Sequence, residues 1–176
     1  TYMPKEMKSE IKEWIKAIGF ALILALLVRG FIFEPMIVPT GSMIPTIQIN
    51  DRILVNKFVY RFQEPQYNDI VVFRYPDDHR QIFVKRLIGK GGDTIEIKNG
   101  VLYRNDIPLD EPYIKEAMWG DFEKHTVPEG HYFMMGDNRN NSKDSRFWNN
   151  SYVSRKEIIG KATYRIWPLN RAGRLE

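Results

Sequence analysis

The chain has 176 residues, of which 43% are hydrophobic and 27% are charged. This length suits one ordinary globular domain, and the apolar content is too high for a disordered chain. The formal net charge of +4, without a run of five like charges, gives no sign of a nucleic-acid-binding surface. The absence of cysteine excludes a disulfide framework, a cysteine nucleophile and a zinc site built on thiolates.

The first predicted element is an apolar helix near the start of the chain. From Ala17 to Val28 there is no charged residue, and three further apolar residues follow Arg29-Gly30. This run is shorter than the roughly 20 residues that a membrane span needs. Because Lys16 and Arg29 can extend their charged ends toward the interface, the usable stretch reaches from Trp14 to Phe33.

Upstream of this stretch, two sets of residues recur at helical spacing, which predicts an interfacial helix that continues into the span. The apolar set is Met7, Ile11, Trp14, Ile15 and Ile18. The lysines on the other faces are Lys5, Lys8, Lys12 and Lys16.

A buried core helix or a cleaved secretory peptide would also explain the apolar segment. A core helix would require a partner for Arg29 and would give the preceding lysines no role. A cleaved peptide needs a small-x-small site after Val28, where Phe-Ile-Phe-Glu stands instead. We therefore predict an uncleaved anchor, with a cytoplasmic amphipathic lead-in and a membrane span over residues 1–33.

The basic residues predict the orientation of this anchor. Four lysines precede the apolar run, whereas Arg29 is the only Lys or Arg between that run and Arg52. The positive-inside tendency places the N-terminus in the cytoplasm and residues 34–176 outside. We therefore expect a single-pass protein of the cytoplasmic membrane, in contact with membrane lipid, whose remaining domain is extracytoplasmic.

After Phe33 the pattern changes from helical to extended. Short apolar runs between clusters of Gly, Pro, Asn and Asp predict strands. These runs cover residues 36–39, 51–58, 69–75, 82–88, 94–98, 101–104, 131–135 and 159–167. Asn99-Gly100 predicts a type I′ hairpin turn, and Ser154 with Glu157 has the spacing of a capping box at the start of one short helix. Strands without regular alternation with helices predict a mainly β domain, built as an all-β barrel or as packed sheets.

The loop directly after the anchor, PTGSMIPT from Pro39 to Thr46, is the first candidate for chemistry. Two prolines and a glycine restrict its backbone, so Ser42 is held in a rigid loop. A structural turn explains the prolines and the glycine equally well. It does not explain why the loop follows the predicted membrane span so closely.

The second candidate is Lys85, in the predicted strand 82–88. Strand alternation places Phe83, Lys85 and Leu87 on one face, so Lys85 projects among apolar neighbours. Burial lowers the pKa of a lysine, and a neutral lysine can take a proton from a serine hydroxyl. A charged residue that guards an exposed strand edge explains the same pattern, and alternation alone favours that interpretation.

Other catalytic arrangements fit less well. Thr40 and Ile44 stand where a G-x-S-x-G motif around Ser42 would require glycine. The histidines, His79, His125 and His131, lack the paired spacing of a metal site, and we expect each of them in a loop or at a strand edge. We therefore predict no metal and no cofactor.

Five segments in this order resemble bacterial type I signal peptidases, also called leader peptidases. They are EPMIVPTGSMIPT (34–46), DRILVNKF (51–58), NDIVVF (68–73), VKRLIGKGGD (84–93) and MGDNRNNSKDSR (135–146). The size and the single predicted span resemble the short form typical of Gram-positive bacteria. The resemblance implies a membrane-bound serine endopeptidase with a Ser-Lys dyad that removes signal peptides from exported preproteins.

The resemblance also implies a role for each matching residue. Ser42 matches the nucleophile, Lys85 the general base, and Thr40 with the Ser42 backbone N–H the oxyanion hole. Threonine stands at position 40, where the family often has serine, and its χ1 angle is more restricted. Ser142 matches a hydroxyl that orients the lysine amine. The supporting residues are Asp144, Arg146, Asp137 and Arg86, of which the last two could form an ion pair.

The family cuts after small residues, usually in an Ala-x-Ala pattern. Matching positions suggest shallow apolar substrate pockets lined by Met36, Val38, Ile47, Ile53, Phe83 and Val84. Such pockets reject larger side chains sterically. An extended substrate could also pair with the strand edges near Val38 and Phe83.

Two rival functions remain open at this stage. A self-cleaving repressor-type Ser-Lys protease would need a DNA-binding helix-turn-helix where the apolar anchor stands. A non-catalytic membrane-tethered binding domain would leave Lys85 and the rigid serine loop without a use.

Overall fold

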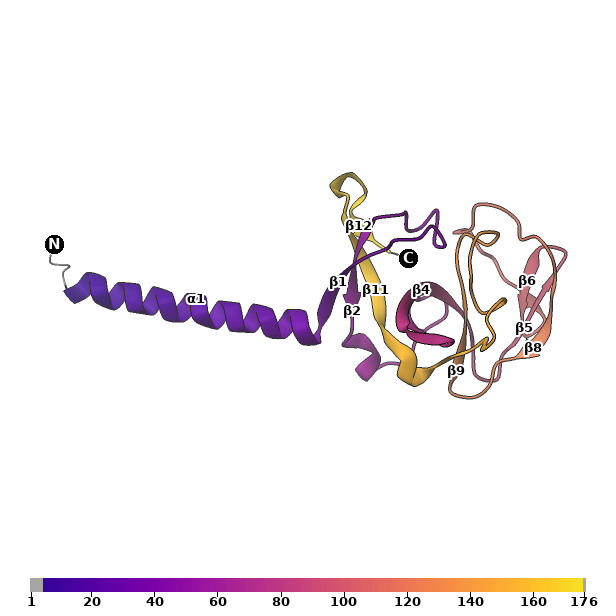
Figure 1. Cartoon of the computed structure of the whole chain (residues 1–176), viewed down its shortest axis with the longest axis horizontal. Helices are drawn as coiled ribbons and strands as arrows, with labels where there is room; N and C mark the ends of the chain where they lie inside the picture. Colours follow the sequence, from indigo (N-terminus) through magenta and orange to yellow (C-terminus); the bar gives the residue numbers. More distant parts are fainter. Residues whose placement is uncertain (1–4, 176) are drawn as a thin grey trace.

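The computed structural model describes residues 5–175, which form one long helix and a β domain (Figure 1). Helix α1 spans Lys5–Phe31 and leaves the domain at the end opposite to strands β5, β6 and β8. Its apolar side chains are exposed: the exposed fractions of Phe20 and Leu26 are 70% and 63%. A core helix would bury these residues, so that interpretation of the segment is wrong.

Within α1, the stretch Ser9–Phe31 is long and apolar enough to cross a membrane. At about 1.5 Å per residue it covers about 34 Å, slightly more than the roughly 30 Å of a hydrocarbon core. The amphipathic lead-in and the span therefore form one continuous helix. Residues 1–4 of the predicted lead-in lie outside the described part of the chain, and so do the side chains of Lys5 and Lys8.

The anchor ends two residues earlier than the sequence pattern suggested. Phe33 is not part of the helix; it opens strand β1, Phe33–Ile37, and pairs with Asn56 of the neighbouring strand. The Lys57 N–H also donates to the Ile32 carbonyl at 2.8 Å. These hydrogen bonds draw the chain into the sheet as soon as α1 ends.

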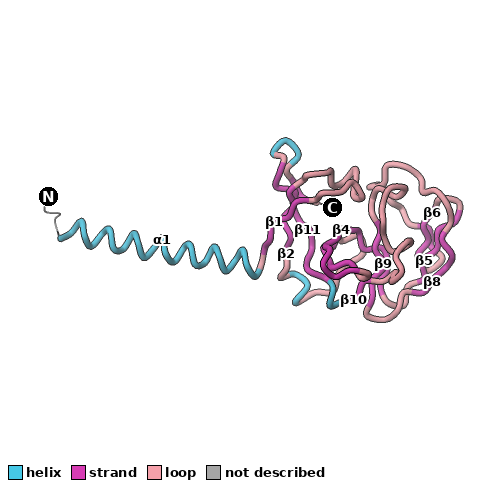
Figure 2. The backbone as a smooth tube through the Cα atoms, in the orientation of Figure 1, coloured by secondary structure: helices cyan, strands magenta, loops and turns pink. Residues whose placement is uncertain are grey.

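The larger sheet has eight strands in the order β1-β2-β11-β3-β4-β9-β10, with β12 beside β11, and all neighbours are antiparallel. Beyond β1, its strands are β2 Arg52–Asn56, β3 Ile70–Tyr75, β4 Asp78–Lys90, β9 His131–Met135, β10 Val153–Ser154, β11 Ile158–Trp167 and β12 Gly173–Arg174. The long loops between them dominate the outline of the domain in Figure 2.

A smaller four-stranded sheet has the order β7-β6-β5-β8. Its strands are β5 Thr94–Lys98, β6 Val101–Arg104, β7 Ile107–Pro108 and β8 Phe122–Thr126. Single turns of 3-10 helix complete the described residues, namely η1 Val59–Arg61, η2 Arg155–Glu157 and η3 Leu169–Arg171. The mainly β prediction is confirmed, and the described strands form two sheets.

Local sequence signals match the structure closely in several places. β5, β6 and β9 have the predicted bounds, and the other predicted strands overlap observed ones. The turn residues Asn99 and Gly100 have φ angles of 52° and 75°, which fits the predicted type I′ turn. Ser154 and Glu157 form the capping box, but the helix that they cap is one turn of 3-10 helix before β11 begins.

Buried apolar side chains form three clusters. The cluster behind β1 and β2 includes Val38, Met43, Ile47, Ile53 and Val55. A second cluster packs around β3 and β9, and a third joins β4 and β9 to the small sheet. The first cluster anchors the candidate serine loop, because Met43 of that loop and Ile47 just after it are fully buried.

Candidate active site

The loop that carries Ser42 is tied down at both ends. The Val38 N–H donates to the Asp51 carbonyl at 2.9 Å, and the Asn50 N–H donates to the Val38 carbonyl at 2.8 Å. Asn50 has a φ of 67°, a conformation that asparagine tolerates better than most residues. The ends of the loop are thus held together while its middle is anchored in the core, so Ser42 has a fixed position.

Lys85 reaches Ser42 from strand β4. Its Nζ donates to the Ser42 Oγ at 2.7 Å and to the Val84 carbonyl at 3.1 Å. The residue is only 4% exposed, and its Nζ lies 5.1 Å from the centre of the Phe83 ring. With a neutral lysine, the Ser42 hydroxyl can donate to Nζ across the same contact.

Burial sets the protonation of this amine. Loss of water around Lys85 lowers its pKa to about 8, although the carboxylates of Asp144 and Asp137 act in the opposite direction. Neither carboxylate forms an ion pair with Lys85, and nor does any other among residues 5–175. A pKa near 8 leaves a useful fraction of neutral amine at neutral pH.

A second loop, residues 136–146, packs against the serine loop. The Asn138 N–H donates to the Ser42 carbonyl at 3.0 Å, and its side-chain amide donates to the Gly41 carbonyl at 2.9 Å. Gly136 allows this close approach. A Cβ at that position would lie 2.4 Å from the Ser42 carbonyl oxygen and 2.2 Å from the Ser142 Oγ, so only glycine fits.

Asp144 and Arg146 stabilise the same loop through hydrogen bonds between its own residues. Asp144 accepts from the Gly136 N–H at 3.0 Å and from Arg146 through both of its oxygens at 2.8 Å. Arg146 also donates to the Arg139 carbonyl at 2.7 Å. Both side chains are almost completely buried, so this pairing keeps the loop in one conformation.

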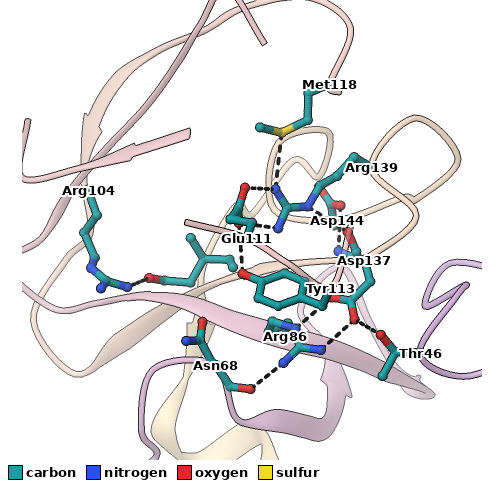
Figure 3. A network of polar contacts seen from close by, with 12 residues as sticks. Thr46, Asn68, Arg86, Arg104, Glu111, Tyr113, Met118, Asp137, Arg139 and Asp144 are labelled. Atoms are coloured by element: carbon teal, nitrogen blue, oxygen red, sulfur yellow. Dashed lines mark hydrogen bonds and ion pairs between the residues drawn. The ribbon is translucent and has the colours of Figure 1, made fainter. Parts of the chain in front are cut away.

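Arg86 and Asp137 form the ion pair that the sequence analysis anticipated (Figure 3). Two parallel hydrogen bonds of 2.8 and 2.7 Å join them, and the Thr46 hydroxyl donates to the same carboxylate at 2.5 Å. A further Arg86 nitrogen donates to the Asn68 carbonyl at 2.9 Å. The pair therefore ties β4 to both the serine loop and the 136–146 loop.

Sequence reasoning missed a third group of residues behind this pair, shown in Figure 3. Glu111 accepts two hydrogen bonds from Arg139, at 2.6 and 2.5 Å, and one from the Tyr113 hydroxyl at 2.9 Å. The Tyr113 ring lies 3.8 Å from the guanidinium carbon of Arg86. Glu111 and Tyr113 lie between β7 and β8, in a stretch without a recognisable pattern, so no local signal identified them.

Ser142 and Thr40 also reach the site. The Ser142 Oγ is buried and makes no hydrogen bond within the described chain, so the structure contains no bond from it to Lys85. Thr40 is exposed and lines the cleft together with Ser42, and its hydroxyl makes no hydrogen bond among residues 5–175.

The serine and the lysine open into a cleft of about 800 Å³. Four of the six apolar residues expected to contact substrate line it: Met36, Val38, Phe83 and Val84. Ile47 and Ile53 do not line the cleft, which corrects that expectation. Both are fully buried in the core cluster behind β1 and β2, because the core needs their side chains to support the serine loop.

Two strand edges border this cleft. β1 is the last strand of its sheet and pairs only with β2. Residues 82–85 of β4 pair with β3 on one side, whereas pairing with β9 begins only at Arg86. Backbone groups of both edges can therefore bind an extended peptide.

The three histidines contact groups other than Ser42 and Lys85. His79 pairs with Glu157 at 2.7 Å, and His125 and His131 each contact a backbone carbonyl two residues away. Within residues 5–175, no group of His, Asp and Glu side chains could hold a metal ion.

Comparison with known proteins gives consistent matches. The family model described as "Signal peptidase, peptidase S26" matches residues 11–167. The probable signal peptidase I-1 of Synechocystis sp. is 44% identical over 172 residues, covering 94% of this chain and 87% of the relative. Signal peptidase I P of Bacillus subtilis subsp. natto is 44% identical, covering 95% of both chains. The crystal structure of a signal peptidase I from Enterococcus faecalis is 35% identical with a TM-score of 0.52, covering 57% of this chain and 98% of that chain.

Proposed function

Because the chain belongs to the signal peptidase family, peptidase S26, we propose that it removes signal peptides with Ser42 as nucleophile and Lys85 as general base. The observation that carries the assignment of the two residues is the 2.7 Å contact between Lys85 Nζ and Ser42 Oγ at the floor of the cleft. An endopeptidase of this family needs one activated hydroxyl and one base beside it. This pair supplies both.

The proposed reaction begins with neutral Lys85, which takes the proton of the Ser42 hydroxyl as Oγ attacks the scissile carbonyl carbon. The carbonyl oxygen becomes an oxyanion, which the Ser42 N–H and the Thr40 hydroxyl stabilise from the rim of the cleft. Lys85 then gives its proton to the leaving amine, and the mature protein departs. A water molecule, deprotonated by Lys85, hydrolyses the acyl-enzyme and restores the Ser42 hydroxyl.

The loop of residues 136–146 supports this chemistry, and its residues Asn141 and Lys143 also line the cleft. We assign Asp144, Arg146, Asp137 and Arg86 to holding the serine loop against β4, as their hydrogen bonds indicate. Ser142 is assigned to orient the lysine amine once substrate occupies the cleft. Its buried hydroxyl has no other partner among the described residues, and such a group is expected to find one.

Substrate recognition follows from the walls of the cleft. Met36, Val38, Phe83 and Val84 leave shallow apolar space, which favours small residues such as the alanines of an Ala-x-Ala site. The open edges of β1 and β4 would bind the substrate backbone. A precursor shortened to the residues around the cut should therefore still be cleaved, and complete dependence on distant sequence would contradict this binding mode.

The membrane placement is also proposed. α1 crosses the cytoplasmic membrane once, with its N-terminus in the cytoplasm and the β domain outside, where exported preproteins emerge. Because the chain has no cysteine, single introduced cysteines can test this on intact cells. A membrane-impermeant maleimide should label Lys98→Cys and leave Glu6→Cys unlabelled; the reverse pattern would overturn the orientation.

The catalytic assignment is tested with detergent-solubilised protein and a secretory precursor that carries Ala-x-Ala. Ser42→Ala and Lys85→Met should each reduce cleavage by about four orders of magnitude or more, as for other serine proteases that lose the nucleophile or base. Lys98→Met, the same change at an exposed position on β5, is the matched control and should cleave normally.

Each outcome decides between the remaining functions. Unchanged cleavage by Ser42→Ala or Lys85→Met would refute the Ser-Lys mechanism. Absence of cleavage by the wild-type protein would favour the non-catalytic binding domain. Cleavage of the chain itself, without cleavage of the precursor, would favour the self-cleaving protease.

A further inference from the structure

A second polar cavity, of about 310 Å³, lies where α1 joins the β domain. Six of the residues that line it come from the end of α1, from the link between β2 and η1, from η1 and from η2: Gly30, Phe31, Lys57, Tyr60, Arg61 and Arg155. An adjoining hollow adds Arg29 of the last helical turn. Neither hollow includes a residue of the proposed catalytic machinery.

The position of this cavity along α1 places it at the level of lipid headgroups. The apolar stretch Ser9–Phe31 ends at the cavity, and at about 34 Å it already exceeds a hydrocarbon core of roughly 30 Å. Arg29 near its end belongs at the interface, where its charge can reach water and phosphate. Lys57 Nζ donates to the Gly30 carbonyl at 2.8 Å, so the domain is joined to the helix at this same depth.

The charge around the cavity is unbalanced. Lys57 pairs with Glu34 at 3.1 Å, and Arg155 lies 3.5 Å from Glu64 while donating to the Tyr60 carbonyl. Arg61 has no carboxylate partner within residues 5–175, and its guanidinium carbon lies 6.0 Å from the centre of the Phe58 ring.

Arg29 makes no hydrogen bond or ion pair in the described chain. These four cations therefore have two carboxylate partners; of the two unpaired cations, Arg61 lines the cavity and Arg29 lines the adjoining hollow. This arrangement attracts an anion.

Exposed aromatic side chains are found at the cavity, which Phe31 lines, and at the two ends of η1, where Phe58 and Phe62 stand. Phe31 is 58% exposed, Phe62 is 74% exposed, and Phe58 is 39% exposed beside Phe62 at a ring separation of 4.8 Å. Aromatic rings with basic neighbours are common at the membrane–water boundary, where the rings contact acyl chains and the cations contact phosphate. A soluble anion would use only the cations, whereas a phospholipid would use both.

We propose that this cavity binds the phosphate headgroup of an anionic phospholipid, held by Arg61 and Arg155 with Arg29 at its edge. The acyl chains would lie along Phe31, Phe58 and Phe62 beside the last turn of α1. The bound lipid would join the helix end to η1 and η2, and so hold the β domain at one depth on the bilayer. This inference needs α1 to cross a membrane, as proposed above, but it does not depend on the Ser42–Lys85 assignment.

The test is native mass spectrometry of the full chain released from detergent micelles, with phosphatidylglycerol or phosphatidylcholine added. The wild-type protein should retain phosphatidylglycerol several-fold more than phosphatidylcholine. Arg61→Gln should lower that retention about five-fold, the usual effect of one basic residue near an anionic membrane. Arg61→Gln/Arg155→Gln should abolish the preference. Lys124→Gln, the same charge change on β8 at the far end of the domain, should bind as the wild type does.

The remaining outcomes would overturn the proposal. Equal retention of the two lipids, or equal retention of phosphatidylglycerol by the wild type and both variants, would exclude a headgroup site here. Displacement of the lipid by an equal concentration of free glycerol phosphate would show a site for soluble phosphate instead. Cleavage of precursor in detergent checks that each variant is folded; if the double variant is not, Arg61→Gln decides alone, because it removes no buried partner.

Discussion

Lys85 and Arg86 are neighbours on β4, both are almost completely buried, and the structure treats their charges in opposite ways. Arg86 faces a network in which Asp137 binds it through two hydrogen bonds and Tyr113 covers its guanidinium. Lys85 faces the cleft, where Phe83 and the Ser42 hydroxyl are its neighbours and no described carboxylate pairs with it. One side of the strand stabilises a cation, and the other side destabilises one.

The difference explains how the proposed general base and a structural cation can be adjacent on one strand. A buried arginine with a carboxylate stays charged and holds loops together, whereas a buried lysine without one gives up its proton readily. Burial without an ion-pair partner thus lowers the pKa of Lys85. Four experiments test this contrast between Lys85 and Arg86.

The largest change in folding stability is expected from Arg86→Met, which removes the cation that pairs with Asp137. Removal of the cation leaves the Asp137 carboxylate buried without its main partner, which typically costs about 3–5 kcal/mol of folding free energy. Urea denaturation in detergent measures this loss. Arg86→Met/Asp137→Leu should recover part of it, and a double variant as unstable as the single one would contradict the pairing argument.

Lys85→Met, at the cation without a carboxylate partner, should have the opposite effect: it should raise the folding stability. The folded pKa of about 8 lies below the ordinary value of 10.5, so the unfolded chain binds this proton more tightly and stability rises with pH between the two values. At pH 7 the folded protein carries nearly all of this penalty, so its removal should stabilise the inactive variant by about 3 kcal/mol.

The same urea series measures this gain at two pH values. The difference between Lys85→Met and the wild type should shrink at pH 10, and Lys98→Met should show no such dependence. If Lys85→Met were less stable than the wild type at pH 7, burial of the lysine would not cost folding free energy.

Activity should follow the protonation of Lys85. With a pKa of about 8 in the free enzyme, kcat/KM should be half-maximal near pH 8 and about tenfold below its plateau at pH 7, because only the neutral amine can act as base. Precursor cleavage across pH 6–10 gives this profile, with circular dichroism as the check on folding. A flat profile with an intact fold would contradict a neutral-lysine base.

The smallest change in folding stability is expected from Tyr113→Phe, in the group of residues behind the Arg86–Asp137 pair. This change keeps the ring over Arg86 and removes only the hydroxyl that donates to Glu111 at 2.9 Å. A loss of about 1 kcal/mol in stability is typical for one such hydrogen bond. Tyr113→Leu should lose more, since it also uncovers the guanidinium; equal losses would show that the ring contributes nothing.

The elements that sequence reasoning predicted well are those with a local cause. Alternating apolar residues and the Asn99-Gly100 turn predicted the β5–β6 hairpin without any knowledge of the rest of the fold. Strand β8 was missed because most of its residues are polar and exposed, and β7, β10 and β12 have only two residues each. Such strands form because a neighbouring strand pairs with them, and this pairing cannot be predicted from their own residues.

In the candidate site, too, the features with a local cause were predicted and those that depend on the fold were not. The rigid serine loop and the apolar surroundings of Lys85 could be read from the residues, whereas the roles of Asp137, Asp144 and Ser142 came from family resemblance. Ile47 and Ile53 were misplaced because an apolar side chain suits a pocket and a core equally well. The bond between Glu111 and Arg139 joins residues 28 apart in the chain, and only the fold brings them together.

The open edges of β1 and β4 have a consequence for the solubility of the enzyme. An unpaired edge invites strands of other molecules, which is how many β proteins aggregate. Here both edges border one cleft, and Pro35 within β1, with Pro39 just beyond it, removes backbone donors that a neighbouring sheet would need. The cleft can therefore accept one extended peptide while it discourages association between copies of the enzyme itself.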